Sequence, residues 1–402
     1  MSPAADGTAV WPRIPLTRPS VGEAEVEAAR RVLLSGWLAQ GPEAAAFEAE
    51  FAAYVGAPHA VAVSNCTAAL ELVLHARGVG PGQDVVTPSH SFIAAANAIR
   101  RLGARPVFVD IEPEGHNADP ERIAAAIGPR TAAILAVHQL GMPCDLPAIA
   151  EIAEARGVPL IEDAACAAGS EISWQGSWER IGRPHGVAAC FSFHPRKIIT
   201  TGEGGMITTG DAAFAARLRR LRAHGMDLDA HARHVGGVMT ERFVEPGFNM
   251  RPTDVQAALG RVQLAGLDEE VRRRRALAAR YAEKLGAVPG LRPPSEPAWA
   301  RSNWQSYCVG LPDGVDQQAV MRRLADAGVA SRRGVMCVHR EAAYPPGSWS
   351  CRPDADCDGG ECDQLRFSES AQDRSLQIPL FGAMTEAEQD HVVAALASAC
   401  GP

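Results

Sequence analysis

The sequence predicts an α/β protein: a mostly parallel β-sheet covered by helices on both faces, followed by a smaller α+β region. Over the first two thirds of the chain, short apolar runs alternate with amphipathic helical patterns, and strands joined through helices form parallel sheets. The 402 residues are too many for one simple core, and 47% of them are hydrophobic. We therefore expect two domains with large buried interiors.

The elements predicted for the larger region begin with two amphipathic helices, after which strands and helices follow one another. The patterns predict helices at residues 23–34, 44–54, 67–76, 94–102, 120–127, 146–155 and 212–223, and strands at 60–63, from 85 onward, and at 106–109, 133–137, 158–161, 188–193 and 206–209. Residues 227–247 show no periodicity and predict a long irregular loop, and loops of that length usually serve binding.

The last third of the chain has a different pattern. It begins in a long helical region at 254–285, followed by a strand at 307–311 and helices at 317–327 and 386–399. We place the domain hinge along the long helical region, which divides the chain into a large domain, 1–258, and a smaller α+β domain, 259–402. Residues 344–363 are rich in Pro, Gly, Asp and Cys and predict a surface insertion.

Charge and composition argue against several classes of partner. The net charge of −8 argues against nucleic acid, because binding to the phosphate backbone needs a basic face. No apolar stretch is long enough to cross a membrane, and the N-terminus lacks the pattern of a signal peptide. The ten cysteines are scattered rather than spaced as a framework, which favours reduced thiols and a cytoplasmic location.

Two strand ends carry residues suited to binding a charged ligand. Ser64-Asn-Cys-Thr-Ala-Ala69 lies between a strand and a helix, where the N–H groups of Cys66, Thr67 and Ala68 could hold a phosphate. In isolation this segment is better explained as a helix cap. Asp163 ends an apolar strand and could hold a protonated pyridine nitrogen through a charge-assisted hydrogen bond, or could simply cap the next turn.

Two further segments follow along the chain. In Phe191-Ser-Phe-His-Pro-Arg-Lys197 a lysine leaves an apolar strand and enters the glycine-rich stretch 200–205, as a Schiff-base lysine would. A surface lysine is the ordinary alternative. Gly247-Phe-Asn-Met-Arg-Pro-Thr-Asp254 contains the candidate anion ligands Asn249 and Arg251 beside a helix cap, and a capped helix start alone explains it equally well.

Taken together and in order, these four segments resemble the DegT/DnrJ/StrS family of sugar-nucleotide aminotransferases, within fold type I of the pyridoxal-phosphate enzymes. The resemblance runs from Gly36-Trp-Leu-Ala-Gln-Gly-Pro42 to residues 376–380 and the helix that follows. It implies a mostly parallel seven-stranded sheet flanked by helices in the large domain, and a smaller α+β domain at the C-terminus.

The resemblance also implies a role for each candidate residue. Lys197 would form the Schiff base with pyridoxal 5'-phosphate, and Asp163 would bind the pyridine nitrogen. The other implied positions are the phosphate cradle of Thr67, Ala68 and Ser192, the aromatic ring of Phe92 stacked on the cofactor, and Asn249, which would reach the phosphate of a second subunit. The expected assembly is therefore a homodimer with shared active sites.

One position departs from the family pattern. Where the family has Gln or His three residues after the aspartate, this chain has Cys166. A thiol is a weaker hydrogen-bond partner for the phenolic oxygen of the cofactor, so the tuning of the ring would differ. The alternative is a small buried cysteine that only fills space.

The implied activity is a pyridoxal-phosphate-dependent transamination from an amino acid, L-glutamate by the resemblance, to a keto-sugar nucleotide, with the motif around Lys197 favouring C4 of the sugar. Alternatives are a non-sugar ketone as acceptor, a sugar dehydratase, which carries His in place of the lysine, and a non-catalytic binding protein. A zinc site at Cys351, Cys357 and Cys362 near His339 is a further hypothesis, against which the spacing favours a loop disulfide or free thiols.

Overall fold

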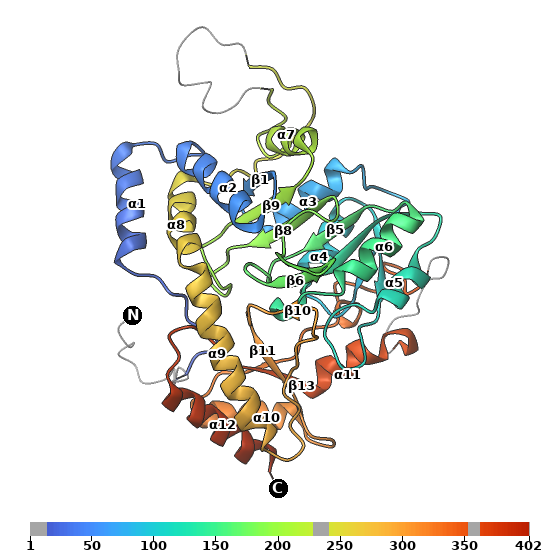
Figure 1. Cartoon of the computed structure of the whole chain (residues 1–402). Coiled ribbons are helices and arrows are strands. Elements are labelled where there is room, and N and C mark those ends of the chain that lie inside the picture. The colour runs from blue at the N-terminus through green and yellow to red at the C-terminus, as the bar shows by residue number, and fades with distance from the viewer. Residues whose placement is uncertain (1–13, 228–240, 353–361, 402) are drawn as a thin grey trace.

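A seven-stranded sheet forms the centre of the molecule in the computed structural model, which describes residues 14–227, 241–352 and 362–401 (Figure 1). The strand order is β1-β9-β8-β5-β4-β2-β3, and only β9 runs antiparallel to its neighbours. The strands are β1 (His59–Val63), β2 (Asp84–Pro88), β3 (Arg105–Val109), β4 (Thr131–Val137), β5 (Leu160–Asp163), β8 (Ala188–Ser192) and β9 (Gly205–Thr209). This arrangement confirms the predicted fold class.

Helices cover both faces of this sheet and enclose a separate hydrophobic core on each. One face is packed by α2 (Pro42–Val55), α5 (Pro120–Ala126) and α6 (Leu146–Arg156), which contribute Phe51, Ile123 and Ile149. The other is packed by α3 (Cys66–Ala76), α4 (Ala94–Arg101) and α7 (Ala212–Leu221), through side chains such as Leu70 and Leu218. Apolar strands buried on both faces are what a parallel sheet requires.

The C-terminal part builds a third core around a sheet of its own. Strands β11 (Tyr307–Gly310), β13 (Ser375–Ile378) and β12 (Arg332–Arg333) pair antiparallel in that order. Helices α9 (Leu267–Gly286), α10 (Gln317–Asp326) and α12 (Glu386–Cys400) pack around this sheet, with α11 (Arg366–Arg374) beside it (Figure 1). A third sheet joins β10 (Ala300–Arg301) to the hairpin of β6 (Glu171–Trp174) and β7 (Ser177–Arg180).

The long helical region predicted at 254–285 is two helices, α8 (Asp254–Ala265) and α9, joined at Gly266. Glycine weakens a helix interior, and the acidic residues at 268–270 favour a new helix start at that point. α8 packs against α1 (Glu23–Ser35) and α2, whereas α9 runs down to the C-terminal core (Figure 1). No helix in the described ranges is both long and apolar enough to cross a membrane.

The prediction of a surface insertion at residues 344–363 is wrong for the part that the structure describes. Tyr344 and Trp349 are 3% and 0% exposed and pack around Phe108. Ser350 pairs with β3, because its carbonyl accepts from the N–H of Phe108 at 2.7 Å. The burial of these two aromatic side chains outweighs the polar composition of the segment, which therefore covers the edge of the large sheet. Residues 353–361, and most of the predicted loop 227–247, lie outside the described ranges.

Candidate active site

A cavity of about 820 Å³ opens at the carboxyl ends of the parallel strands, where open α/β sheets bind ligands. Its walls come from the strand ends of the large sheet, from the first turn of α3, and from residues beside β11 and β12 of the C-terminal sheet. The predicted site residues that line it are Cys66, Thr67, Ala68, Phe92, Asp163, Cys166, Ser192 and Lys197. Segments far apart in the sequence therefore meet in one cavity.

The first turn of α3 presents backbone donors to this cavity. Asn65 caps the helix, and its Oδ1 accepts from the N–H of Ala68 at 2.8 Å. Cys66 and Thr67 are the first two residues of α3, so their N–H groups have no carbonyl partner within the helix and are available to an anion. Gly205 permits this arrangement, since a Cβ there would lie 2.6 Å from the carbonyl carbon of Asn65. The thiol of Cys66 points inward, toward the carbonyl of Cys190, and burial raises its pKa.

Asp163 lies at the end of β5, buried between β4 and β8. Its Oδ1 accepts from the N–H of Ala165 at 3.0 Å. Burial raises the pKa of this carboxyl above its ordinary value, against the opposing effects of the Ala165 N–H, Lys197 and His138. A carboxylate in such surroundings lacks sufficient positive charge, and a pyridinium nitrogen would supply it.

Lys197 lines the same cavity as Asp163, and the charges of the two side chains interact. Its Nζ lies 3.1 Å from the Sγ of Cys166. Burial lowers the pKa of this amine, but Cys166 and Asp163 outweigh burial, and the net shift is upward. A nucleophilic lysine needs a lowered pKa, so the carboxylate neighbour must first be neutralised by another cation before the amine becomes a good nucleophile.

The loop that carries Lys197 is fixed by its own hydroxyl groups. Thr200 donates from Oγ1 to the carbonyl of Phe193 at 2.9 Å, and Thr201 donates to the carbonyl of Glu203 at 2.7 Å. Glycine is needed at position 204, because a Cβ there would clash with the Oγ1 of Thr201. The threonines and glycines after the lysine thus close a tight turn that returns the chain into β9.

The other predicted residues differ in where they lie. Phe92 stands at the cavity with 57% of its surface exposed, and Ser192 ends β8 beside Gly205. Asn249 does not line the cavity of its own chain; it is exposed, and its Oδ1 accepts from the Nε of Arg251 at 3.1 Å. Its predicted task lies at a second subunit, so this position leaves that prediction open.

Several cavity residues were missed by the sequence reasoning, among them a histidine, a glutamine and an arginine. His138 follows β4, Gln305 precedes β11, and Arg332 lies in β12. The Nδ1 of His138 accepts a hydrogen bond from the backbone N–H of Cys144. The Nε2 therefore carries the ring proton and donates it to Glu162 at 3.0 Å. Gln305 and Arg332 belong to the C-terminal part and reach the site only through the tertiary fold. Nothing in their local sequence marked them.

The residues suggested for zinc do not form a ligand set where the structure describes them. His339 uses both ring nitrogens, Nδ1 with Ser89 at 2.6 Å and Nε2 with Glu369 at 2.9 Å. Cys351 is disulfide-bonded, which agrees with the loop-disulfide alternative for this segment but departs from the general expectation of reduced thiols. Cys362 is a free thiol, and Cys357 lies outside the described residues. No cluster of three or more possible ligands occurs in the described ranges.

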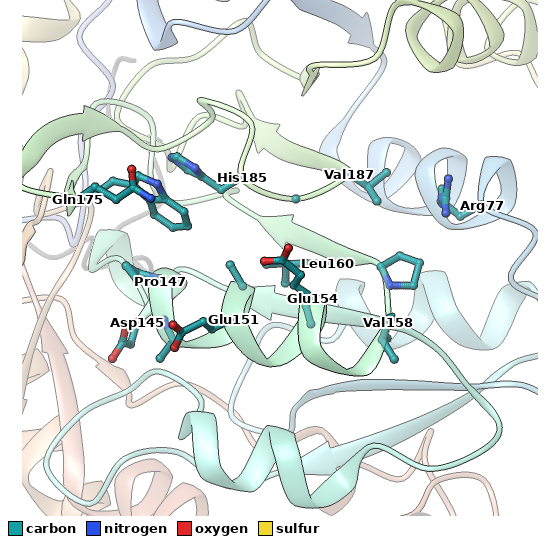
Figure 2. Close-up of a pocket in the computed structure, with 17 residues that line it drawn as sticks. Arg77, Asp145, Pro147, Glu151, Glu154, Val158, Leu160, Gln175, His185 and Val187 are labelled. Carbon is teal, nitrogen blue, oxygen red and sulfur yellow. Dashed lines mark hydrogen bonds between the residues drawn. The ribbon is translucent and has the colours of Figure 1, made fainter.

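A second cavity, of about 920 Å³, lies at the opposite ends of the strands (Figure 2). It runs along α6 and past the start of β5 and the segment before β8, where His185 and Val187 lie. Its lining has three carboxylates, those of Asp145, Glu151 and Glu154, against the single arginine Arg77, and this net negative charge disfavours a phosphate. It contains none of the predicted site residues, so the cavity of Lys197 and Asp163 is the candidate active site.

Comparison with known proteins agrees with this geometry. The model of the DegT/DnrJ/EryC1/StrS aminotransferase family matches residues 19–397. The chain belongs to this family. The solved structure of the aminotransferase TlmJ from Streptoalloteichus hindustanus is similar to it, with 38% identity, a TM-score of 0.85, and 96% of this chain and 98% of that chain covered.

Two other similar structures show how varied the relatives of this aminotransferase are. The first, 3-amino-5-hydroxybenzoic acid synthase, has 31% identity and a TM-score of 0.83, and covers 97% of this chain and 99% of its own. The second, Spr1654, a candidate sugar aminotransferase from Streptococcus pneumoniae solved in its pyridoxamine-phosphate form, has 25% identity and a TM-score of 0.87, with coverage of 96% and 99%. Family and neighbours together identify a pyridoxal-phosphate-dependent aminotransferase.

The residues of the cavity fit this cofactor. The N–H groups at the start of α3 suit a phosphate, and Gly205 keeps the chain clear of them. The under-compensated carboxylate of Asp163 suits a protonated ring nitrogen, and the amine of Lys197 suits an aldehyde. Cofactor and chain thus complement each other at three separate groups.

Proposed function

We propose that this aminotransferase moves the amino group of L-glutamate to a nucleotide-linked keto-sugar, with C4 of the sugar as the accepting carbon. The observation that carries the proposal is the polar wall of the cavity around Lys197, which includes amide side chains of Gln139, Gln305 and Gln377. An amide can both donate to and accept from hydroxyl groups, as a sugar requires. The resemblance to Spr1654 supports a sugar as acceptor.

The cofactor and the chain divide the chemistry between them. When bound, pyridoxal phosphate supplies an electron-accepting ring that takes up the electron pair released at the substrate carbon. The N–H groups of Cys66 and Thr67 would donate to its phosphate, and the carboxylate of Asp163 would keep a proton on the ring nitrogen. The charge-assisted bond at Asp163 is what keeps the ring electron-poor.

Lys197 would act twice. Its Nζ would hold the cofactor through the cofactor's carbonyl carbon, and would give up this place to the amino donor. The free amine would then accept the proton from the substrate carbon and hand it on, as general base and acid. Cys166, 3.1 Å from this amine, would orient it between the two positions. The same groups would serve again when the amino group passes to the acceptor.

A homodimer with shared sites belongs to the same proposal. Large apolar side chains are exposed on α1, with Leu33 and Leu34 58% and 72% accessible, and on a neighbouring loop at Leu38. An exposed apolar surface on a helix edge is typical of a subunit interface. Asn249, which does not line the cavity of its own chain, would complete the site of the second subunit.

A ketone other than a sugar is the second candidate acceptor. The chain is about as similar to 3-amino-5-hydroxybenzoic acid synthase, named for an aromatic product, as to sugar aminotransferases. A sugar dehydratase is disfavoured because Lys197 stands where those enzymes carry histidine.

The test is turnover with a defined acceptor. The purified holoenzyme is given L-glutamate together with a nucleotide-linked 4-keto-sugar or with a cyclic non-sugar ketone, and 2-oxoglutarate is measured. We expect repeated turnovers with the 4-keto-sugar and a single turnover without an acceptor. Repeated turnover with the non-sugar ketone alone would favour the second candidate. An absence of 2-oxoglutarate in every reaction would exclude glutamate as donor.

A further inference from the structure

A thiol and an amine lie in contact on the wall of the active-site cavity. The Sγ of Cys166 is 3.1 Å from the Nζ of Lys197, and both residues line the cavity. Each side chain is partly exposed, so a small molecule that enters the cavity can reach both. Cysteines that are partly exposed and stand beside a cation are the ones that react with oxidants. Transamination itself does not use the reactivity of this sulfur.

One short segment of the C-terminal part holds these two side chains together. Asn303 donates from Nδ2 to the carbonyl of Cys166 at 2.8 Å. Two residues later, Gln305 donates from Nε2 to the carbonyl of Arg196, the residue before Lys197. The N–H of Gln305 also donates to the Oδ1 of Asn303 at 2.8 Å. Because Asn303 and Gln305 are 0% and 6% exposed, the loop of the thiol and the loop of the amine are fixed relative to each other.

The other cysteine at the cavity has different surroundings. Cys66 and Cys166 are the two free cysteines of the described residues that line the cavity. Cys66 is buried, its thiol donates to the carbonyl of Cys190, and burial raises its pKa. A raised pKa keeps the sulfur protonated, whereas oxidants react with the thiolate. An oxidant in the cavity therefore meets Cys166 as the accessible sulfur, with an amine already in contact.

A peroxide supplies the oxidising power to join the two groups. The thiolate attacks one oxygen of hydrogen peroxide, the O–O bond breaks, and a sulfenic acid and water are formed. The nitrogen of Lys197 then attacks this sulfur, the S–O bond breaks, and the departing hydroxide leaves as water with a proton from the amine. The sulfur is oxidised and the peroxide is reduced to two waters. The thiol and the amine each lose one hydrogen, and an S–N bond remains, as sulfenic acids also form with backbone nitrogens.

The form of the cofactor decides whether the amine is available for this step. Lys197 is the residue proposed to hold pyridoxal phosphate, and an amine bound to the cofactor is not free to attack the sulfur. Pyridoxamine phosphate carries an amine in place of the aldehyde, so it leaves Lys197 free beside Cys166. The cofactor-free chain does the same. The two forms of the cofactor should therefore differ in how they protect the enzyme from a peroxide.

We propose that Cys166 and Lys197 form an oxidation site, at which a peroxide closes a reversible S–N bond whenever the amine is free of pyridoxal phosphate. The bond blocks the amine that transamination requires. An added thiol reverses it, because its sulfur attacks the sulfur of Cys166, the S–N bond breaks, and the amine takes up the proton; a second thiol then releases Cys166. The bond itself needs only the two side chains, whereas protection by pyridoxal phosphate rests on the proposed function.

The experiment treats three forms of the purified protein with hydrogen peroxide: cofactor-free, loaded with pyridoxal phosphate, and loaded with pyridoxamine phosphate. Remaining thiols are alkylated, and peptide mapping by mass spectrometry locates any link between side chains. The variant Cys166→Ser removes the sulfur. The control is Cys400→Ser, which removes a half-buried free thiol in the last turn of α12, away from the cavity. Each variant is compared with its own untreated sample.

We expect linked peptides of Cys166 and Lys197, lighter by two hydrogens or about 2 Da, in the cofactor-free and pyridoxamine-phosphate forms and not in the pyridoxal-phosphate form. Linked cofactor-free protein should develop no visible absorbance band when pyridoxal phosphate is added, and dithiothreitol should restore the band. Cys400→Ser should behave as the wild type does. Cys166→Ser should bind pyridoxal phosphate equally well before and after peroxide.

Two results would overturn the proposal. One is a Cys166 that ends as a sulfinic or sulfonic acid while Lys197 stays unmodified. The other is a Cys166→Ser protein that loses cofactor binding after peroxide as fully as the wild type does. A link that forms equally in the presence of pyridoxal phosphate would support the S–N bond, and would instead contradict the assignment of Lys197 as the residue that holds the cofactor.

Discussion

Asp163 shows how a buried charge in the site lowers the folding stability of the chain. Its ordinary pKa is 3.8, and burial raises that value in the folded, cofactor-free chain. The folded state then holds the proton to higher pH than the unfolded state does. Stability therefore falls as pH rises from the ordinary pKa through the raised folded value, and the cost stays in full above that window. A cationic ring nitrogen offsets this cost, which couples cofactor binding to folding.

The substitution Asp163→Asn tests this reasoning. In the cofactor-free protein, the variant should have a Tm at pH 8 equal to or above that of the wild type, because the buried charge is gone and the amide oxygen can still accept from Ala165. The two Tm values should converge when the pH falls below the ordinary pKa of the carboxyl. The variant should bind pyridoxal phosphate about 10- to 100-fold more weakly, as expected for a lost charge-assisted bond.

Thermal unfolding with and without the cofactor at several pH values provides the measurement. A cofactor-free variant that is much less stable than the wild type at pH 8 would show that the carboxylate stabilises the fold by itself, contrary to this account.

For single residues, the local sequence was enough to predict some members of the site and not others. Asn65 to Ala68, Asp163 and Lys197 each stand at a strand end or helix start that periodicity could locate, so their meeting in one cavity could be predicted. Gln305 and Arg332 could not be predicted, since single polar residues in short segments look like any others. Their position depends on how the C-terminal sheet packs against the loop of Lys197.

Among the elements, β9 makes a close backbone contact with the site. This antiparallel strand begins beside the start of α3, and a Cβ at Gly205 would lie 2.6 Å from the carbonyl carbon of Asn65 and 2.9 Å from the nitrogen of Cys66. Gly205→Ala should force the strand and helix apart. We expect a loss of about 1–3 kcal/mol in unfolding free energy, as overpacking usually causes, together with weaker cofactor binding.

A neighbouring glycine supplies the control for this prediction. Gly210 lies just after β9, and a methyl group added there would have its nearest neighbouring atom 3.6 Å away, so Gly210→Ala should change stability little. Chemical denaturation and titration with pyridoxal phosphate measure both effects. Equal behaviour of the two variants would mean that the contact at Gly205 does not shape the phosphate site.

The elements that the sequence did not predict share a physical cause. The hairpin of β6 and β7 has only four residues in each strand and turns at Gln175 and Gly176, both with positive φ. Strands β10 and β12 contain two residues each. Such short strands have no detectable periodicity, and tertiary pairing alone defines them. The break at Gly266 was visible in the sequence, but one glycine inside a long helical pattern does not decide it.

For the whole molecule, the exposed apolar side of α1 bears on assembly. If α1 forms part of the subunit interface, Leu34→Glu places a charge where apolar surface would be buried, and the dimer should dissociate at least about tenfold more readily. Activity and cofactor retention should fall together with the dimer, because Asn249 would no longer reach the second site. Trp178, 39% exposed on β7, provides the control as Trp178→Ala.

Sedimentation velocity at several protein concentrations, combined with the visible absorbance of the cofactor, measures both effects. A Leu34→Glu protein that stays dimeric and fully active would exclude this helix face from the interface. The division of the chain at residue 258 likewise stays a prediction, since α8 packs on the first two helices while α9 belongs to the C-terminal core.

The lysine content of the chain makes the central assignment unusually easy to test. Lys197 and Lys284 are the only lysines in the sequence. Lys284 lies in the last turn of α9, where its Nζ pairs with Asp390 at 2.7 Å, and it does not line the active-site cavity. The variant Lys284→Arg keeps that ion pair and leaves Lys197 as the single lysine.

The most direct measurement is reduction of the holoenzyme with borohydride, followed by peptide mapping by mass spectrometry. We expect the cofactor to become permanently attached to Lys197, in the wild type and in Lys284→Arg alike, and Lys197→Ala to be neither yellow nor labelled. Attachment at Lys284, or a Lys197→Ala protein that keeps its visible band, would contradict it.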